Sequence, residues 1–242
     1  FSGLLKNGVF PLPELMQMSL SYGAQAMRRP VEIEMACNIN DDRTGDFCLL
    51  QIRPIVDTKQ EIVEDITAIP DADCLLRSHN ALGNGVSREI TDVVYVKYDD
   101  AFSAANNPAV AADIERINQL FLDDGRNYVL IGPGRWGSSD PWLGVPVKWP
   151  ALSAARIIVE VALAGYHVDP SQGTHFFQNL TSLGVGYFTV DTNHSPEGGF
   201  VNKDILDSMP AINETAYVRH VRFERPLKIM IDGKRQEGAV VM

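Results

Sequence analysis

The fold of this chain is decided by residues 91–137, which read TDVVYVKYDDAFSAANNPAVAADIERINQLFLDDGRNYVLIGPGRWG. The stretch opens with a β-branched and aromatic run, residues 91–98, that predicts a strand. Residues 108–122 carry apolar side chains at helical spacing, and residues 128–131 form a second strand-like run. Because strands separated by helical segments are typical of layered α/β proteins, we expect an α/β fold.

The same alternation continues towards the C-terminus. We expect a helix over residues 152–156, a strand over 156–160, a helix over 174–183, a strand over 185–190, and a hairpin joining 228–231 to 238–241 through Asp232-Gly233. On the N-terminal side we expect a helix over 13–27 and an antiparallel hairpin made of strands 31–37 and 47–54.

Composition then changes over residues 57–90, where acidic, proline and turn-forming residues are scattered. We therefore expect an N-terminal unit over residues 1–57, a linker over 58–80, and an α/β domain over 81–242.

The chain has 242 residues, of which 45% are hydrophobic and 21% charged, so a disordered or collagen-like chain is excluded. Its net charge is −10, which argues against general affinity for nucleic acid or anionic membranes. Three cysteines without C-x-x-C spacing suggest neither a disulfide framework nor a zinc site. No signal peptide or membrane span is predicted, and we expect a cytoplasmic protein. The start at Phe1, without methionine, suggests a piece of a longer protein.

One set of polar residues lies on the predicted hairpin. Glu32 and Glu34 are two apart on one strand, as are Gln51 and Arg53 on the other, so each pair projects from one face. Carboxylate and amide oxygens suit Mg²⁺, and an arginine fork can hold phosphate oxygens. The alternative is a solvated amphipathic hairpin without a ligand.

A second candidate is His175, which follows Gly173-Thr174 at the start of the helix expected over 174–183. A helix start favours a phosphoryl group, and neutral imidazole can act as a nucleophile near pH 7. The alternative is a half-buried histidine with Thr174 as the N-cap.

A third candidate is the glycine-rich loop after residue 131. Gly132 and Gly134 would let the backbone approach a ligand, and Arg135 supplies a cation for phosphate. The loop matches neither a P-loop nor the Gly-x-Gly-x-x-Gly pattern. The alternative is a tight loop anchored by Trp136 and Trp142.

The hairpin resembles a known family. Residues 31–36, VEIEMA, followed by residues 49–54, LLQIRP, are similar to the end of the ATP-grasp nucleotide-binding domain of phosphoenolpyruvate synthase and pyruvate phosphate dikinase. The resemblance implies that Glu34 and Gln51 are metal ligands near ATP and that Arg53 contacts its phosphates. Met35 stands where the family has an aromatic residue.

Residues 80–190 loosely resemble the swivelling β/β/α phosphohistidine domain that follows in that family. His175, the interval to Leu183-Gly184-Val185 and the strand after it match the family's order and spacing. Gln172-Gly173 and Gly186 depart from its Gly-Gly and proline.

The resemblance implies a phosphotransferase that uses ATP and Mg²⁺. A phosphoryl group would pass from ATP through His175 to pyruvate or a related small-molecule acceptor. The partners would be the missing remainder of the parent chain, namely the ATP-grasp body and a pyruvate-binding domain. The alternative is a non-catalytic, nucleotide-responsive binding or regulatory module that kept the fold.

Overall fold

The computed structural model describes residues 10–27, 31–40, 42, 44–54, 64–98, 102–163, 180, 183–191 and 198–242. The chain divides into two compact units, Phe1–Asp57 and Thr58–Met242. None of the helices in the described ranges combines the length and apolar character that crossing a membrane requires.

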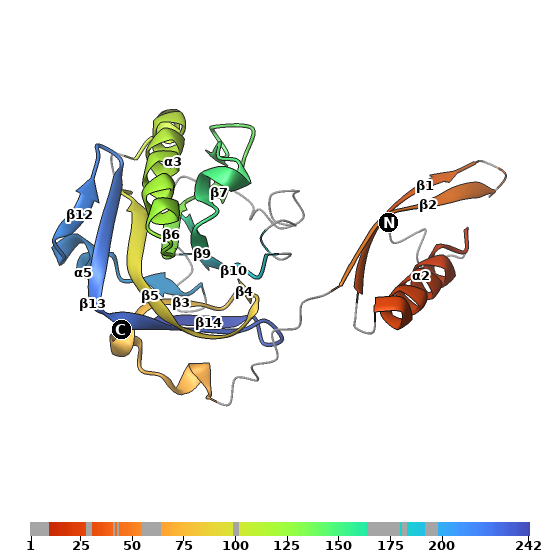
Figure 1. Ribbon diagram of the computed structural model, residues 1–242, viewed down its shortest axis with the longest axis horizontal. Coiled ribbons are helices and arrows are strands. Elements are labelled where there is room, and N and C mark those ends of the chain that lie inside the picture. Colours follow the sequence, from red (N-terminus) through yellow and green to blue (C-terminus); the bar gives the residue numbers. More distant parts are fainter. Residues whose placement is uncertain are drawn as a thin grey trace. The chain divides into compact units, whose positions relative to one another are not determined.

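The first unit is a helix on a two-stranded sheet (Figure 1). Helix α2 spans Leu12–Met27, and strands β1 (Val31–Ile39) and β2 (Gly45–Pro54) pair antiparallel. The predicted helix and hairpin are thus confirmed. The helix packs close to β2 because position 23 is glycine, where a Cβ would lie 2.2 Å from Cδ1 of Ile52.

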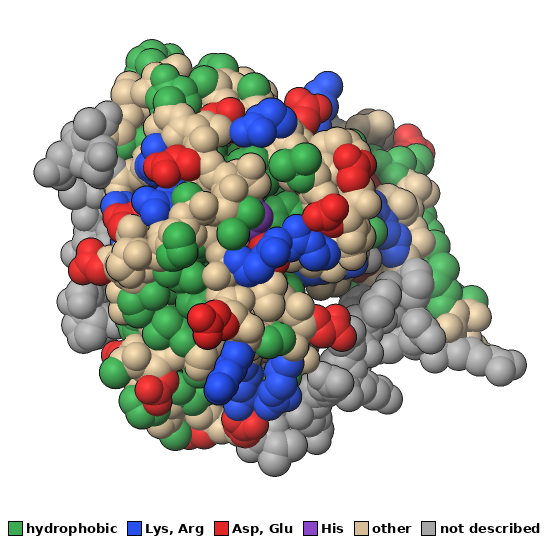
Figure 2. Space-filling view, turned by 60° about the vertical axis from the view of Figure 1, so that its left-hand side comes forward, with side chains coloured by type: hydrophobic (Ala, Val, Ile, Leu, Met, Phe, Trp, Pro, Cys, Tyr) green, Lys and Arg blue, Asp and Glu red, His purple; other side chains and the backbone are tan. Residues whose placement is uncertain are grey.

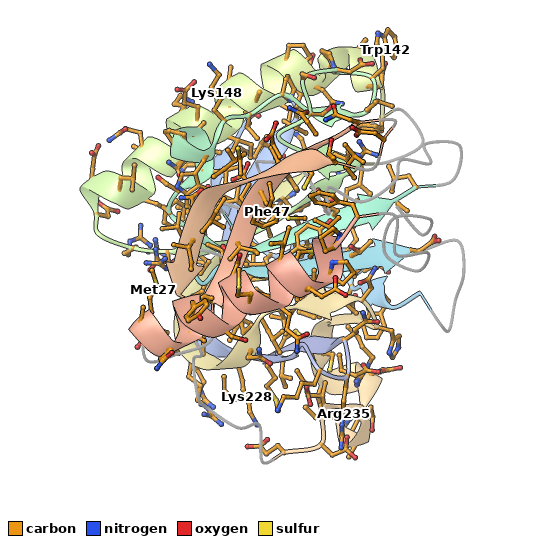
Figure 3. The ribbon with its side chains drawn as sticks, turned by 90° about the vertical axis from the view of Figure 1, so that its right-hand side faces the viewer. Met27, Phe47, Trp142, Lys148, Lys228 and Arg235 are labelled. Carbon is orange, nitrogen blue, oxygen red and sulfur yellow. The ribbon has the colours of Figure 1, made fainter. Side chains whose placement is uncertain are left out.

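Little of this unit is buried. Its buried described residues are Phe10, Leu12, Gly23 and Val31. Its exposed large apolar side chains are Met18, Tyr22, Met27, Leu49 and Leu50. Figure 3 shows Met27 at the end of α2 and Phe47 on β2. Within the described residues, the unit therefore exposes more large apolar side chains than it buries.

The second unit is built on a sheet with the strand order β11-β3-β14-β13-β5-β6-β9-β10-β4, to which β12 adds beside β13. The strands are β3 (Cys74–Ser78), β4 (Ala81–Leu82), β5 (Asn84–Val96), β6 (Tyr128–Pro133), β9 (Ala155–Ala162), β10 (Gly186–Asp191), β11 (Phe200–Val201), β12 (Ala211–Glu214), β13 (Val218–Asp232) and β14 (Glu237–Val241). Strands β5, β6, β9 and β10 are parallel neighbours, and the other pairs are antiparallel. Helices α3 (Asn107–Asp123) and α5 (Lys203–Ser208) complete a mixed α/β unit.

The sheet curls back on itself. Strands β3 and β4 are separated by only His79 and Asn80, yet β3 pairs with β14 and β4 with β10, near opposite ends of the order. The carbonyl of Asn80 also accepts a hydrogen bond of 3.0 Å from the amide of Thr189 on β10. The curled sheet therefore encloses apolar side chains on its concave side.

Two apolar clusters fill the two faces of the sheet. The concave cluster includes Leu75, Val93, Ile131, Val159 and Phe188. The outer cluster joins Val94, Leu130 and Ile158 to the α3 residues Ile114 and Ile117. Figure 1 shows α3 lying along the sheet beside β6. The strict alternation of neighbours such as Val93 and Val94 between the clusters follows from the strand period of two.

The sequence predictions for this unit are largely confirmed, with exceptions. The strand at 91–98, the helix at 108–122, the strand at 128–131 and the C-terminal hairpin are present as β5, α3, β6 and β13–β14. The hairpin loop is longer than an Asp-Gly turn, because Asp232 pairs with Glu237 and residues 233–236 form the loop, in which Gln236 adopts a φ of 60°. Of the helix expected over 174–183, only residues 180 and 183 are described, so that prediction lies outside the described residues.

Two predictions are corrected. The linker expected over 58–80 does not hold for residues 64–80, because Cys74, Leu75 and Leu76 are fully buried in β3. The helix expected from residue 152 is instead a 3-10 turn, Trp149–Leu152, followed by β9. β-Branched residues and parallel pairing with β6 favour the extended strand there.

Candidate functional site

The polar face of the hairpin brings four predicted residues together. Glu34 lies directly opposite Gln51, and Glu32 lies opposite Arg53. Directly opposed residues project from the same face of an antiparallel pair with Cβ atoms ~4.5–5.5 Å apart. The register therefore places all four side chains on one face.

Arg53 is tied to its neighbours on this face. Its Nη2 donates a hydrogen bond of 2.6 Å to Oε1 of Gln51, and its Nε lies 4.0 Å from Oε1 of Glu32. The Arg53 side chain is 29% exposed, and that of Glu32 is 49% exposed. The guanidinium is therefore held in place over the strand pair, within reach of solvent.

Glu34 differs from its neighbours. It is half-buried, yet its carboxylate has no hydrogen bond or ion pair with any residue that the structure describes. Directly after it the register shifts, because Met35 pairs with Leu49 and leaves Leu50 unpaired. Such bulges are frequent beside functional sites, where they redirect neighbouring side chains.

The donor set fits a magnesium–phosphate complex better than a closed metal site. No group of three or more His, Cys, Asp and Glu side chains in the described part of the chain is placed to hold a metal. Glu34 and Gln51 supply two hard oxygens. Mg²⁺ is commonly held by one or two carboxylates, with phosphates and water completing its ligands.

The glycine-rich loop between β6 and β7 (Arg135–Trp136) has a different character. Its backbone amides are used inside the protein: those of Gly134, Arg135, Trp136 and Gly137 donate to Val161 O, Leu143 O, Glu160 Oε1 and Val145 O. A phosphate cradle needs free amides of this kind. The loop therefore matches the tight-loop alternative and not the expected phosphate site.

Trp136 explains the glycine before it. A Cβ at Gly132 would lie 2.4 Å from Cζ2 of Trp136, whose indole is 1% exposed and donates through Nε1 to Val159 O at 3.1 Å. Gly132 thus makes room for the indole, and Gly134 adopts the left-handed φ of 67° that the turn requires. Trp142, expected as a second anchor, instead projects into solvent with 65% of its surface exposed (Figure 3).

Two buried carboxylates were not predicted as site residues. Glu160 on β9 is 3% exposed, and it accepts hydrogen bonds from the Trp136 amide at 3.0 Å and from the Tyr187 hydroxyl. This carboxylate therefore fixes the glycine-rich loop to the sheet. In the sequence, the position of Glu160 inside the apolar run of residues 157–163 indicates a buried carboxylate.

The second is Asp92 on β5, which is 1% exposed. It accepts hydrogen bonds of 2.7 Å from His220 Nε2, 2.9 Å from Arg222 Nε, 2.9 Å from Arg126 Nη1 and 2.8 Å from Thr91 Oγ1. Burial raises the pKa of Asp92, but its hydrogen bonds, led by those from His220 and Arg222, lower it by more. The pKa of this carboxyl therefore lies well below its ordinary value.

The Asp92 network is structural. His220 is 2% exposed and lies under α3, with its ring 5.0 Å from that of Phe121. Arg126 lies three residues after the end of α3, so its bond to Asp92 joins the segment that follows the helix to the sheet. A substrate would not reach a pair buried this deeply.

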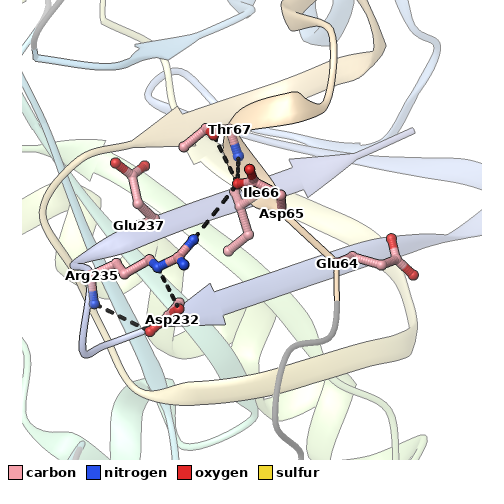
Figure 4. A pocket seen from close by; sticks show the side chains of 7 residues that line it. All are labelled: Glu64, Asp65, Ile66, Thr67, Asp232, Arg235 and Glu237. Atoms are coloured by element: carbon pink, nitrogen blue, oxygen red, sulfur yellow. Dashed lines mark hydrogen bonds and ion pairs between the residues drawn. The ribbon is translucent and has the colours of Figure 1, made fainter.

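A pocket of about 170 Å³ lies beside the β13–β14 turn (Figure 4). Its lining residues are Glu64, Asp65, Ile66, Thr67, Asp232, Arg235 and Glu237. Its acidic groups already have partners: Asp65 accepts from Thr67, and Glu237 pairs with His79 at 2.9 Å. Among the residues that the structure describes, none of the predicted site residues lines this pocket.

The remaining predictions are placed as follows. His175 and Gly173-Thr174 lie outside the described residues. On the face shown in Figure 2, basic and acidic side chains are interspersed and form no continuous basic field.

No family model matches the chain, and no curated protein or solved structure matches it.

Proposed function

We propose that this chain is part of a cytoplasmic phosphotransferase resembling phosphoenolpyruvate synthase and pyruvate phosphate dikinase. The observation that supports it is the hairpin register, which sets Glu34 opposite Gln51 with Arg53 beside them, while the Glu34 carboxylate has no partner among the described residues. The first unit would be the end of an ATP-grasp domain, and the second a diverged swivelling phosphohistidine domain.

In this proposal the residues have separate tasks. Glu34 and Gln51 hold Mg²⁺, which neutralises phosphate charge when it is bound. Arg53 binds phosphate oxygens through its fork of N–H groups. His175 would attack phosphorus, so that an N–P bond forms as a P–O bond of ATP breaks and the rest of the nucleotide leaves. The N–P bond would then break as an oxygen of pyruvate or a related acceptor takes the phosphoryl group.

The exposed apolar surface of the first unit supports the proposed partner. Met18, Tyr22 and Leu50 are 50%, 66% and 60% exposed. Large exposed apolar side chains on a unit that buries few described residues are typical of a surface that a partner covers. We propose that the remainder of an ATP-grasp domain covers it, and that a separate domain binds the acceptor.

A non-catalytic, nucleotide-responsive module is the second candidate. It is favoured by the glycine-rich loop, where the amides of residues 134–137 have partners inside the protein. In that case the hairpin would still bind a magnesium nucleotide, and His175 would carry no phosphate.

The test is phosphorylation of the complete protein that contains this chain. The protein is incubated with Mg²⁺ and ATP labelled at either the β or the γ phosphate, and acid-labile protein-bound label is counted. Label in the wild type that is lost in H175A supports the carrier. Label that persists in H175A, or none in a protein shown to bind ATP, refutes it and leaves the binding module.

The metal site has its own matched pair of variants. E34Q should abolish labelling and weaken magnesium–nucleotide binding by about tenfold or more, since it removes a charged ligand. E32Q removes an equal charge from the same face at a residue not proposed as a ligand, and should keep most of the binding. Equal losses in both variants would contradict the ligand assignment.

A further inference from the structure

The hairpin contains a conflict between two proposed roles. The hydrogen bond from Arg53 Nη2 to Gln51 Oε1, 2.6 Å long, uses the amide oxygen assigned to the metal and the guanidinium assigned to phosphate. Glu34, the other metal ligand, has no partner among the described residues. Within the described residues, the proposed ligand Glu34 is therefore without a partner, whereas the proposed ligand Gln51 is hydrogen-bonded to Arg53.

Both cations cannot share the amide oxygen without strong repulsion. Mg²⁺ binds oxygen at ~2.1 Å, so it would lie less than about 5 Å from the guanidinium nitrogen. At that separation like charges repel appreciably even near a protein surface. A metal ion that takes Gln51 Oε1 must therefore displace the guanidinium.

A triphosphate gives the displaced guanidinium a better partner. Phosphate oxygens accept two parallel N–H bonds from arginine, whereas the Gln51 amide is neutral and offers one oxygen. The 4.0 Å contact with Glu32 is a weaker attachment still. The nucleotide thus removes Arg53 from the ligand that the metal needs.

We propose that Arg53 is a switch that couples metal binding to nucleotide binding at this site. This inference rests on the proposed function of the hairpin. In the resting site Arg53 blocks Gln51, so metal alone binds weakly. When the nucleotide engages Arg53, Gln51 Oε1 is released and completes the metal site with Glu34.

The test measures Mn²⁺ binding by the loss of the free-ion electron paramagnetic resonance signal, with no nucleotide present. The difference between wild type and E34Q isolates the hairpin site from other acidic groups. Removing the guanidinium in R53M should tighten binding of Mn²⁺ alone by about 3- to 10-fold, because the blocking cation is gone. R53M should also weaken binding of a magnesium complex of a non-hydrolysable ATP analogue by about tenfold, because a phosphate ligand is lost.

R53K separates the specific hydrogen bond from general charge. Lysine keeps the charge but lacks the planar fork. The switch predicts that R53K also binds Mn²⁺ alone more tightly than wild type, whereas a general charge effect leaves it unchanged.

The failures are distinguishable. Unchanged or weaker Mn²⁺ binding in R53M, or wild-type Mn²⁺ binding in R53K, overturns the switch while the nucleotide site stands. Mn²⁺ and nucleotide binding that are both indifferent to E34Q overturn the proposed hairpin site, and the switch with it.

Discussion

Replacing Asp92 by asparagine should destabilise the second unit strongly. The carboxylate is 1% exposed and accepts charge-assisted hydrogen bonds from Arg126 and Arg222, besides those from His220 and Thr91. Breaking a buried ion pair costs ~3–5 kcal/mol. Asparagine keeps one acceptor oxygen but turns an N–H group towards the cationic donors, so we expect a loss near the lower end, about 3 kcal/mol.

Urea unfolding followed by tryptophan fluorescence measures this loss in the second unit alone. All three tryptophans of the chain belong to that unit: Trp136, Trp142 and Trp149. With a denaturant slope of about 2 kcal/mol per molar urea, the midpoint should fall by about 1.5 M. D124N is the matched control, because Asp124 pairs with Arg126 at 2.8 Å but its side chain is 55% exposed.

The control should lower stability by less than about 1 kcal/mol, as is usual for exposed pairs. If D92N lowered the unfolding free energy no more than D124N, the Asp92 network would not stabilise the unit and the reasoning from burial would fail.

The dependence of stability on pH supplies a second check. Because the folded-state pKa of Asp92 lies below its ordinary value of 3.8, its contribution is complete above that value and is lost as the pH falls further. The gap between wild type and D92N should therefore shrink below about pH 4.

Three further results are expected. G132A should lower the unfolding free energy by about 1–3 kcal/mol, since the new methyl would lie 2.4 Å from the Trp136 ring; an unchanged urea midpoint would contradict the packing argument. E160Q should lower the unfolding free energy by about 2 kcal/mol and shift the emission of Trp136, because the Trp136 amide donates a hydrogen bond of 3.0 Å to the Glu160 carboxylate. Unchanged emission would mean that the loop does not depend on this carboxylate. A thiol reagent should modify exposed Cys48 quickly and Cys74 only after unfolding, because burial raises the pKa of the Cys74 thiol; fast reaction at Cys74 would contradict the position of β3.

The sequence predicts local elements well where one period dominates. Helix α3 repeats its apolar residues at Ile114, Ile117 and Phe121, and β5 contains a continuous apolar run, so both were found from pattern alone. Strand β3 was mistaken for linker because its apolar core, Leu75-Leu76, is short and flanked by charged residues. Its burial depends on pairing with β14, far away in the chain, which no local window contains.

For the candidate site too, local pattern predicts some features, and others depend on residues that are distant in the chain. Alternation alone predicted that Glu34 and Gln51 each share a face with a second polar residue, but only the strand register sets them opposite each other. Asp92 and Glu160 were visible as charges within apolar runs, yet their partners His220 and Tyr187 come from distant strands. A buried charge can thus be suspected from sequence, whereas its role requires the fold.

The glycine-rich loop and the polar face of the hairpin, the two candidate phosphate sites, differ in how many of their hydrogen-bonding groups already have partners. In the loop of residues 134–137 each amide already has a protein acceptor, so a phosphate would have to displace bonds and leave those acceptors unpaired, at ~1–3 kcal/mol each. On the hairpin, Glu34 has no hydrogen bond or ion pair with a described residue that a ligand would displace, and Arg53 would exchange the neutral Gln51 oxygen for charged phosphate oxygens. Nucleotide binding should therefore respond to substitutions at Glu34 and Arg53. Substitutions in the loop should change stability and leave binding intact, because the loop serves the sheet that holds it.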